Sequence, residues 1–276
     1  MKLEKIWAVY FSGTGTTRRT VERIAGGIAS RLNLPAESVD FSHPAVRQET
    51  LRFGEKDLVV FGTPVYAGRV PNVLLPFLRE RVVGGGALAV PVVLFGNRNY
   101  DDALIELRNI LAVDGMHPIA AGAFVGEHSF SRVLGADRPN AEDEALMDEF
   151  AARVAELAAG LDAAPVKSVA VQGQEPLRPY YTPRDRAGNP INILKVKPKT
   201  DLSRCGGCGL CADLCPMGSI DPADVSAVRG ICIKCCACVK GCPTGAKFFD
   251  DAGYLYHQHE LEAQYARPAE NEVFYL

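Results

Sequence analysis

All nine cysteines of the chain lie between Cys205 and Cys242, and eight of them follow a repeated spacing. Two residues separate the first three cysteines of each copy, three residues precede the fourth, and a proline follows it. The copies are Cys205, Cys208, Cys211 and Cys215, then Cys232, Cys235, Cys238 and Cys242. Each member of the second copy lies 27 residues after its counterpart, which indicates an internal duplication with two similar halves.

This spacing predicts two [4Fe–4S] clusters. Disulfides of a secreted scaffold would be spread along the chain, whereas thiolate ligands in a reducing compartment fit such confinement. Three cysteines separated by two residues can wrap one corner of a cubane, and the fourth, ahead of proline, reaches the other cluster. We therefore expect one cluster on Cys205, Cys208, Cys211 and Cys242, and the other on Cys232, Cys235, Cys238 and Cys215.

Two structural zinc sites are the alternative, because paired cysteines separated by two residues also bind zinc. Zinc would leave the proline-terminated ending and the 27-residue symmetry unexplained. Residues 201–250 resemble a bacterial-type two-cluster ferredoxin, which implies a small α+β domain. Cys236 has no counterpart in the repeat, and we expect a small buried residue there rather than a ligand or redox group.

The N-terminal half begins with a pattern typical of an anion site. A buried strand is expected over Lys5–Phe11, followed by Ser12-Gly13-Thr14-Gly15-Thr16-Thr17 and a helix to about Arg31. Backbone N–H groups at a helix N-terminus bind anions, and hydroxyls add donors without fixed charge, which favours a phosphate monoester. The loop lacks the P-loop pattern and the third glycine of the dinucleotide fingerprint. A merely structural glycine turn is the alternative.

Two later loops follow predicted strands and support a flavin site. The strand Asp57–Phe61 precedes a loop over residues 62–71, and the strand Ala89–Phe95 precedes a loop over residues 96–102. In an open parallel sheet all three loops fall at the carboxyl edge, where ligands bind. Each later loop offers an aromatic ring and backbone amides suited to a flat isoalloxazine.

Together the three loops resemble the flavodoxin set over residues 1–162. The resemblance implies FMN and a doubly wound parallel sheet of order 2-1-3-4-5, with further helices near Pro71–Val83, Asp101–Val113 and Ala141–Leu161 and a strand near Met116–Phe124. The implied ribityl-phosphate contacts are Ser12, Gly13, Thr14, Gly15, Thr16 and Thr17. The implied ring contacts are Thr63, Pro64, Val65, Tyr66, Ala67 and Gly68, with Gly96, Asn97, Arg98 and Tyr100 at the pyrimidine edge. Tyr66 is the expected stacking residue, and plain loop packing is the alternative for Tyr66 and Tyr100.

The remaining segments are read from composition. Residues 163–200 form a proline-rich basic linker that either packs on both domains or receives an acidic partner, and the aromatic tail 251–276 is expected to pack back on the body. His128, at another strand end, is expected to make a loop hydrogen bond rather than to gate protons. A net charge of −3 gives no case for nucleic acid or an anionic membrane, no membrane span is present, and a cytoplasmic location is expected.

The two halves together resemble the flavodoxin–ferredoxin fusion family, labelled EFR1-type ferredoxins, found mainly in anaerobes. The resemblance implies an electron-transfer protein that relays electrons between a low-potential donor, two [4Fe–4S] clusters, FMN and a partner oxidoreductase. One alternative is an FMN-dependent reductase of a small acceptor, and another is a sensor or scaffold with structural clusters. No second nucleotide motif or catalytic constellation is visible, which favours the carrier. Flavin-to-cluster transfer within one chain and transfer across a homodimer both stay open.

Overall fold

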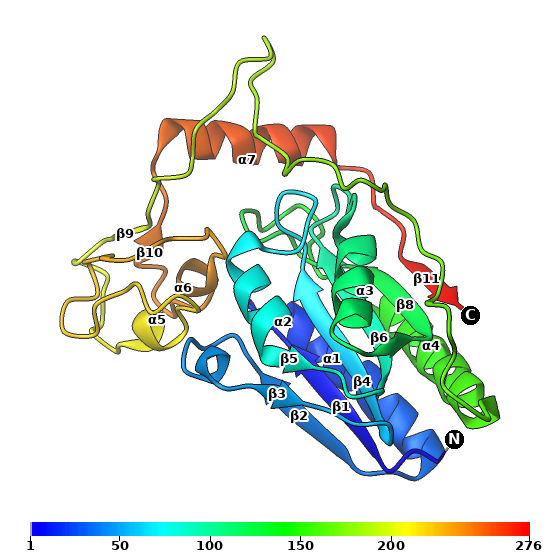
Figure 1. Ribbon diagram of the computed structural model, residues 1–276. Coiled ribbons are helices and arrows are strands. Elements are labelled where there is room, and N and C mark those ends of the chain that lie inside the picture. Colours follow the sequence, from blue (N-terminus) through cyan, green and yellow to red (C-terminus); the bar gives the residue numbers. More distant parts are fainter. Residues whose placement is uncertain (1) are drawn as a thin grey trace.

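The computed structural model describes residues 2–276, and its largest element is a seven-stranded sheet. The strand order is β11-β8-β6-β4-β1-β2, and the short strand β7 pairs with β6. These strands are β1 (Lys5–Tyr10), β2 (Ala36–Asp40), β4 (Asp57–Pro64), β6 (Leu88–Phe95), β7 (His117–Pro118), β8 (Ala120–Val125) and β11 (Glu272–Tyr275). All pairs are parallel except β8 with β11 (Figure 1). The predicted order 2-1-3-4-5 is confirmed over β2, β1, β4, β6 and β8, and β11 adds an antiparallel edge.

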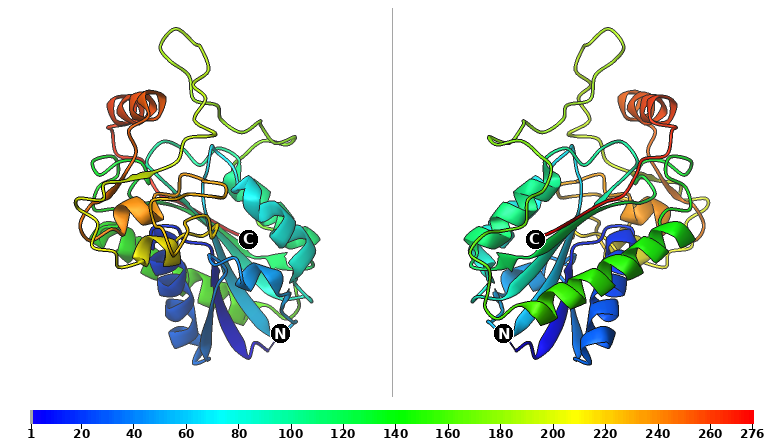
Figure 2. Two further views of the ribbon diagram at one scale, coloured as in Figure 1. Left: turned by 90° about the vertical axis from the view of Figure 1, so that its left-hand side faces the viewer. Right: turned by 90° about the vertical axis from the view of Figure 1, so that its right-hand side faces the viewer.

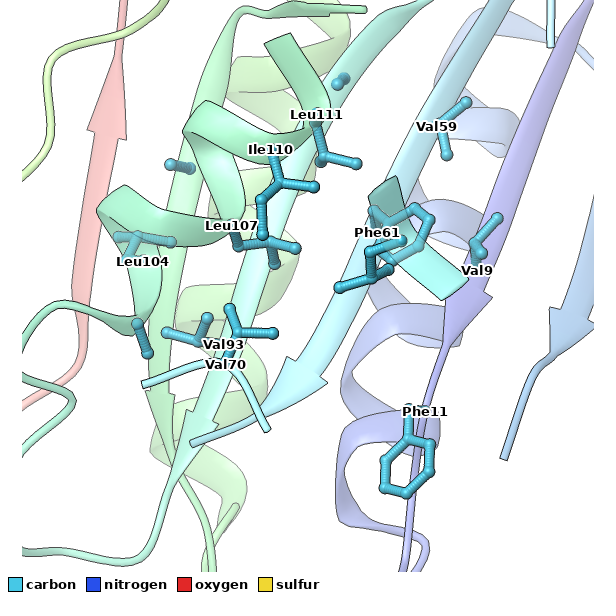
Figure 3. Packing of buried hydrophobic residues seen from close by; sticks show 14 of the residues in the cluster. Val9, Phe11, Val59, Phe61, Val70, Val93, Leu104, Leu107, Ile110 and Leu111 are labelled. Atoms are coloured by element: carbon cyan, nitrogen blue, oxygen red, sulfur yellow. The ribbon is translucent and has the colours of Figure 1, made fainter. Parts of the chain in front are cut away.

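Helices cover both faces of this sheet, as in doubly wound folds (Figure 2). The helices α1 (Thr16–Leu32) and α4 (Ala141–Gly160) pack on one face, and α2 (Leu75–Arg81) and α3 (Ala103–Val113) pack on the other. The central strands are buried on both sides, which explains their continuous apolar runs. Figure 3 shows one of the two resulting cores, where α3 packs its leucines over β4 and β6.

Local signals explain where these elements start and end. Asn140 caps α4 by accepting from the N–H groups of Glu142 and Asp143, and the Asp143 side chain accepts from the Asn140 N–H in return. The expected helix after Pro71 is divided into a 3-10 turn, η2 (Asn72–Leu74), and α2, after which the chain forms β5 (Val82–Val83). β5 pairs in parallel with β3 (Leu51–Arg52), which follows the 3-10 turn η1 (Val46–Gln48).

The segment between α4 and residue 199 has little regular structure but is attached to the flavodoxin-like half. Val169 is fully buried, and its N–H donates to the Pro118 carbonyl at 2.9 Å. Farther along, Arg178 pairs with the buried Asp102, whose carboxylate also accepts from the Arg178 N–H at 2.7 Å. Beyond these contacts the chain extends as the long yellow-green loop in Figure 1.

The cysteine-rich region folds as two related halves. β9 (Lys199–Thr200) pairs antiparallel with β10 (Lys247–Phe248), and the short helices are α5 (Leu210–Asp213) and α6 (Ala237–Lys240). The N–H of Ser219 points to Cys215 Sγ at 3.3 Å, and the N–H of Ala246 points to Cys242 Sγ at the same distance. These two contacts are related by the 27-residue repeat, so the duplication in sequence is also a duplication in backbone geometry.

The C-terminal segment returns to the first half. Helix α7 (Ala252–Gln264) is capped by Asp251, whose side chain accepts from the Tyr254 N–H. The chain then runs to β11, which completes the main sheet beside β8 (Figure 1). Among the residues that the model describes, no helix combines the length and apolar character of a membrane span.

Candidate functional site

The first loop has the geometry of an anion cradle. The N–H of Arg18 donates to Ser12 Oγ at 3.2 Å, and the N–H of Arg19 donates to the Gly15 carbonyl at 3.1 Å. Within residues 2–276, the intervening backbone N–H groups of positions 13–17 have no hydrogen-bond acceptor from the protein. Gly15, the N-cap of α1, has a φ of 88°, a conformation that glycine adopts without steric cost. The loop therefore presents free donors at a helix N-terminus, which fits a phosphate group.

This loop forms one wall of a cavity of about 400 Å³. The flavodoxin-like wall consists of Ser12, Gly13, Thr14, Gly15, Arg18, Asp40, Ser42 and His43. The opposite wall comes from the cysteine-rich region and consists of Leu214, Pro216, Ala237, Lys240 and Gly241. The cavity thus lies between the two halves of the chain. Residues of the second and third predicted flavin loops do not line it.

The second loop is a tight hairpin. Tyr66 and Arg69 exchange both backbone hydrogen bonds, at 3.0 and 3.1 Å, around Ala67 and Gly68, which have φ values of 52° and 76°. Two other segments fix the turn: Tyr181 N–H donates to the Ala67 carbonyl, and Asp102 N–H donates to the Gly68 carbonyl. The Thr63 hydroxyl, on the adjoining strand, is buried without a hydrogen-bond partner in the described chain.

The third loop is engaged by the C-terminal segment. Asn97 Nδ2 donates to the carbonyls of Tyr265 and Arg267, and Asn97 Oδ1 accepts from the Ala269 N–H. Tyr100 is buried, and its hydroxyl donates to Glu272 at 2.8 Å. Gly96 lies so close to the next loop that a Cβ there would be 2.4 Å from His128 Cδ2.

Arg98 of this loop and His128 of the next loop have well-defined polar contacts. Arg98 pairs with Asp101 and also lies over the Tyr181 ring, 4.7 Å from its centroid. His128 makes local loop bonds: its Nδ1 accepts from the Phe130 N–H at 3.1 Å. Burial, with the nearby positive charge of Lys240, lowers the pKa of His128 to about 4, so the ring is neutral near pH 7.

The second cysteine set is brought together. One largely apolar cavity is lined by the four cysteines of the predicted crossed set, Cys215, Cys232, Cys235 and Cys238, and also by Cys236. Burial raises the pKa of Cys235 and Cys238 to about 12, and nearby cysteine charge adds to the effect. Such thiols keep their protons near pH 7 until a bound metal displaces the protons into solvent, as happens at cluster ligands.

The first set is more open to solvent. Cys208 is exposed, and Cys205, Cys211 and Cys242 are partly buried. Although burial opposes the shift, hydrogen bonds from Thr244 and from backbone N–H groups lower the pKa of Cys242 to about 7. Within the described residues, no group of three or more Cys, His, Asp or Glu side chains is arranged to hold a single metal ion.

Cys236, which has no counterpart in the repeat, borders the cavity of the second set. Its side chain is 3 % exposed, and its Sγ lies 3.4 Å from the Tyr254 hydroxyl. Burial raises the pKa of Cys236 to about 12, so the thiol keeps its proton near pH 7. This environment is that of a small buried residue.

The predicted phosphate loop lies against the second cysteine copy at Gly13. A Cβ placed on Gly13 would lie 3.0 Å from Cys235 Cβ and 3.4 Å from the Tyr66 hydroxyl oxygen. Tyr66 is partly buried, and burial together with the neighbouring cysteines Cys235, Cys236 and Cys232 raises its pKa well above the ordinary value. The predicted phosphate loop, the predicted stacking residue and one predicted cluster ligand therefore meet within one chain.

Two basic residues hold this junction and were not singled out by the sequence. Arg47 donates to the carbonyls of Phe41 and Ser42 and to the Pro216 carbonyl at 2.5 Å. Lys240 pairs with Glu127 and donates to the His128 carbonyl at 2.7 Å. Neither belongs to a motif, because their partners across the junction lie more than a hundred residues away in sequence.

Comparisons with known proteins agree with the two-part reading. Residues 8–96 match the family model described as a flavodoxin domain, and residues 198–221 match the model described as a 4Fe-4S binding domain. No curated protein matches the chain significantly.

Solved flavodoxins are among the similar structures. A flavodoxin from the domain Archaea is 17% identical and has a TM-score of 0.41, over 55% of this chain and 96% of that chain. A Fusobacterium nucleatum flavodoxin mutant bound to flavin mononucleotide is 15% identical and has a TM-score of 0.35, over 57% of this chain and 95% of that chain. The narrower EFR1-type label is not tested by these matches. With both domain matches in their expected places, the chain joins a flavodoxin domain to a 4Fe-4S binding domain, an organisation typical of electron-transfer flavo-iron–sulfur proteins.

Proposed function

We propose that this protein is a single-chain electron relay with FMN in its flavodoxin half and two [4Fe–4S] clusters in its ferredoxin half. It would exchange electrons with a low-potential donor and a partner oxidoreductase. The observation that carries the proposal is the contact of Gly13, Tyr66 and Cys235. Because this contact lies within one chain, communication between flavin and cluster does not require a dimer.

The flavodoxin half supplies the flavin contacts in this proposal. The free N–H groups at positions 13–17 hold the phosphate, and Tyr66 with the Ala67–Gly68 turn faces the ring. The turn is held on both sides by Tyr181 and Asp102. In the third loop, Asn97 and Tyr100 fix the C-terminal segment over this edge of the sheet, while Gly96 and Arg98 complete the predicted pyrimidine-edge contacts.

The ferredoxin half supplies thiolates. Cys232, Cys235, Cys238 and Cys215 hold the inner cluster, and Cys205, Cys208, Cys211 and Cys242 hold the outer one. When bound, each cluster supplies one-electron chemistry and FMN supplies one- or two-electron chemistry. The chain's task is to fix distances and to exclude water around the inner set.

Iron analysis of cysteine variants tests the cluster number and the crossed ligands. The reconstituted protein is expected to hold about eight irons and about eight sulfides, four of each per cluster. Cys215→Ala should lose the spectrum of the cluster that begins at Cys232, while Cys236→Ala, which removes a neighbouring non-ligand thiol, should keep both. Loss of the cluster that begins at Cys205 in the Cys215 variant would contradict the crossed assignment.

An anaerobic absorbance titration separates the relay from a reductase. The relay is expected to resist NADH and NADPH and to be reduced fully by a low-potential protein donor. Bleaching of the flavin and cluster bands by either nucleotide alone would indicate a nicotinamide site and an FMN-dependent reductase instead.

A further inference from the structure

We propose that the ferredoxin half completes the FMN phosphate site and that Lys240 is a phosphate-binding residue. This inference rests on the proposed flavin site in the first loop. It concerns the cavity of about 400 Å³ between the halves, one wall of which includes the phosphate loop, while the other consists of α6, Gly241 and the residues Leu214 and Pro216 that follow α5. A phosphate held by the loop N–H groups therefore faces the ferredoxin half rather than open solvent.

Lys240 is the cation of that opposite wall. Its side chain is only 13 % exposed, and its ammonium donates to the Glu127 carboxylate and the His128 carbonyl. An ammonium has three N–H donors, so one is left without a protein acceptor among residues 2–276. Because Lys240 also lines the cavity, this donor is available to an anion there.

The charge balance of the cavity favours a phosphate monoester. Arg18 and Lys240 contribute two positive charges, and Asp40 contributes one negative charge. The Asp40 carboxylate already accepts from the Ser42 N–H at 2.8 Å, and Arg18 lies 3.5 Å from Glu22. The cavity lining thus carries a net charge of +1, with one cation from each half, whereas the first loop alone provides only neutral donors and Arg18.

The position of Lys240 connects flavin binding to the arrangement of the two halves. Lys240 ends α6, the helix between Cys235 and Cys242, and Pro216 of the same wall directly follows Cys215. Arg47, which donates to the Pro216 carbonyl, holds that wall against the flavodoxin half. A bound phosphate would therefore bridge the two domains across the cavity.

Flavin affinity measured on the full-length, cluster-loaded and flavin-stripped protein tests this inference. FMN and riboflavin differ by the phosphate, so fluorescence titration with both isolates its contribution. Lys240→Gln is expected to weaken FMN about tenfold or more, as for the loss of a charge-assisted hydrogen bond, and to leave riboflavin affinity within about twofold. Inorganic phosphate should compete with FMN in the wild type and not with riboflavin, which separates cofactor phosphate from free anion.

Two matched variants exclude indirect effects. Glu127→Gln removes the same ion pair but keeps the ammonium, so FMN affinity should be retained. Lys199→Gln removes an exposed lysine that pairs with Asp250 on the ferredoxin half outside the cavity, and it should also bind FMN normally. Equal weakening of FMN and riboflavin in Lys240→Gln, or no change in either, would overturn the inference. A wild-type protein that binds neither flavin would instead refute the proposed flavin site itself.

Discussion

The two copies of the cysteine repeat share a backbone but have different surroundings. In the first copy, Gly207 and Gly209 adopt φ values of 68° and 76°, and Cys208 is exposed. The equivalent positions of the second copy are Lys234 and Cys236, with φ values of 54° and 58°. Glycine takes this conformation freely, whereas other residues pay about 1–2 kcal/mol.

The second copy compensates for this strain with contacts that the first lacks. Lys234 Nζ donates to the carbonyls of Leu194 and Cys232, and the Cys236 thiol lies against Tyr254. Cys235 packs against the phosphate loop. One duplicated loop therefore has an open surface, while the other is part of the junction with the flavodoxin half.

Serine substitutions at equivalent cysteines give the largest expected contrast. Cys235→Ser should lose about half of the iron and also weaken FMN by more than about tenfold, since its loop forms part of the junction. Cys208→Ser, at the counterpart position, should lose about half of the iron with FMN affinity unchanged. Iron analysis and flavin fluorescence titration check both variants. Equal effects of the two substitutions on FMN would remove the distinction between the copies.

A methyl group at the contact point should produce a smaller effect. Gly13→Ala places a Cβ 3.0 Å from Cys235 Cβ, closer than packed carbons ordinarily approach, and should destabilise the protein by about 2 kcal/mol. Gly26→Ala is the control, because its Cβ would meet no atom within 4 Å and alanine favours the interior of α1 by about 0.5–1 kcal/mol. Urea unfolding of both variants provides the measurement. A stability for Gly13→Ala equal to that of the wild type would contradict the close packing of the two halves.

The sequence predicted the main sheet because its central strands are long apolar runs that end in recognisable loops. The edge strand β2 was not named, because Ala36–Asp40 is largely exposed and lacks a clear alternation. Strand β11 has no signal in the sequence either, because its four residues are only partly buried. They form a strand by pairing with β8, which is distant in sequence. Strands defined by a distant partner leave little local signal.

The cluster ligands are predicted for a different reason, since the spacing itself indicates the site. The junction between the halves could not be predicted, because Lys240 and Arg47 contact partners that no motif links to them. The third flavin loop illustrates the limit: its position after a strand was predicted correctly, but Asn97 and Tyr100 bind the C-terminal segment. A loop that follows a strand can be assigned to one edge of the sheet, but its sequence does not show which other segment packs over that loop.

Acid is expected to destabilise the contact between the two halves without affecting the first copy of the cysteine repeat. The pKa of His128 sets the pH range of this effect. The pKa of His128 is about 4 in the folded protein, against 6.5 ordinarily, because of burial first and then the positive charges of Lys240, His257 and Arg98, opposed by Glu262. Between these two pH values His128 is protonated in the unfolded chain but not in the folded chain. Its contribution to the free energy of unfolding is therefore fully present above pH 6.5 and declines as the pH falls toward 4. Because the ring is not fully shielded from water, we expect a loss of about 1 to 2 kcal/mol across this range.

Urea unfolding at about pH 7 and about pH 5 measures this loss, within the range where histidine charge changes. His128→Gln should flatten the profile, since glutamine can still accept from the Phe130 N–H but cannot take up the proton. His43→Gln, at an exposed histidine of the cavity wall, should keep the wild-type profile. Since the His128 carbonyl binds Lys240, the same acid step should weaken FMN and leave the spectrum of the outer cluster unchanged. If both clusters respond to acid alike, the junction does not depend on His128, and the second copy is no more coupled to the flavodoxin half than the first.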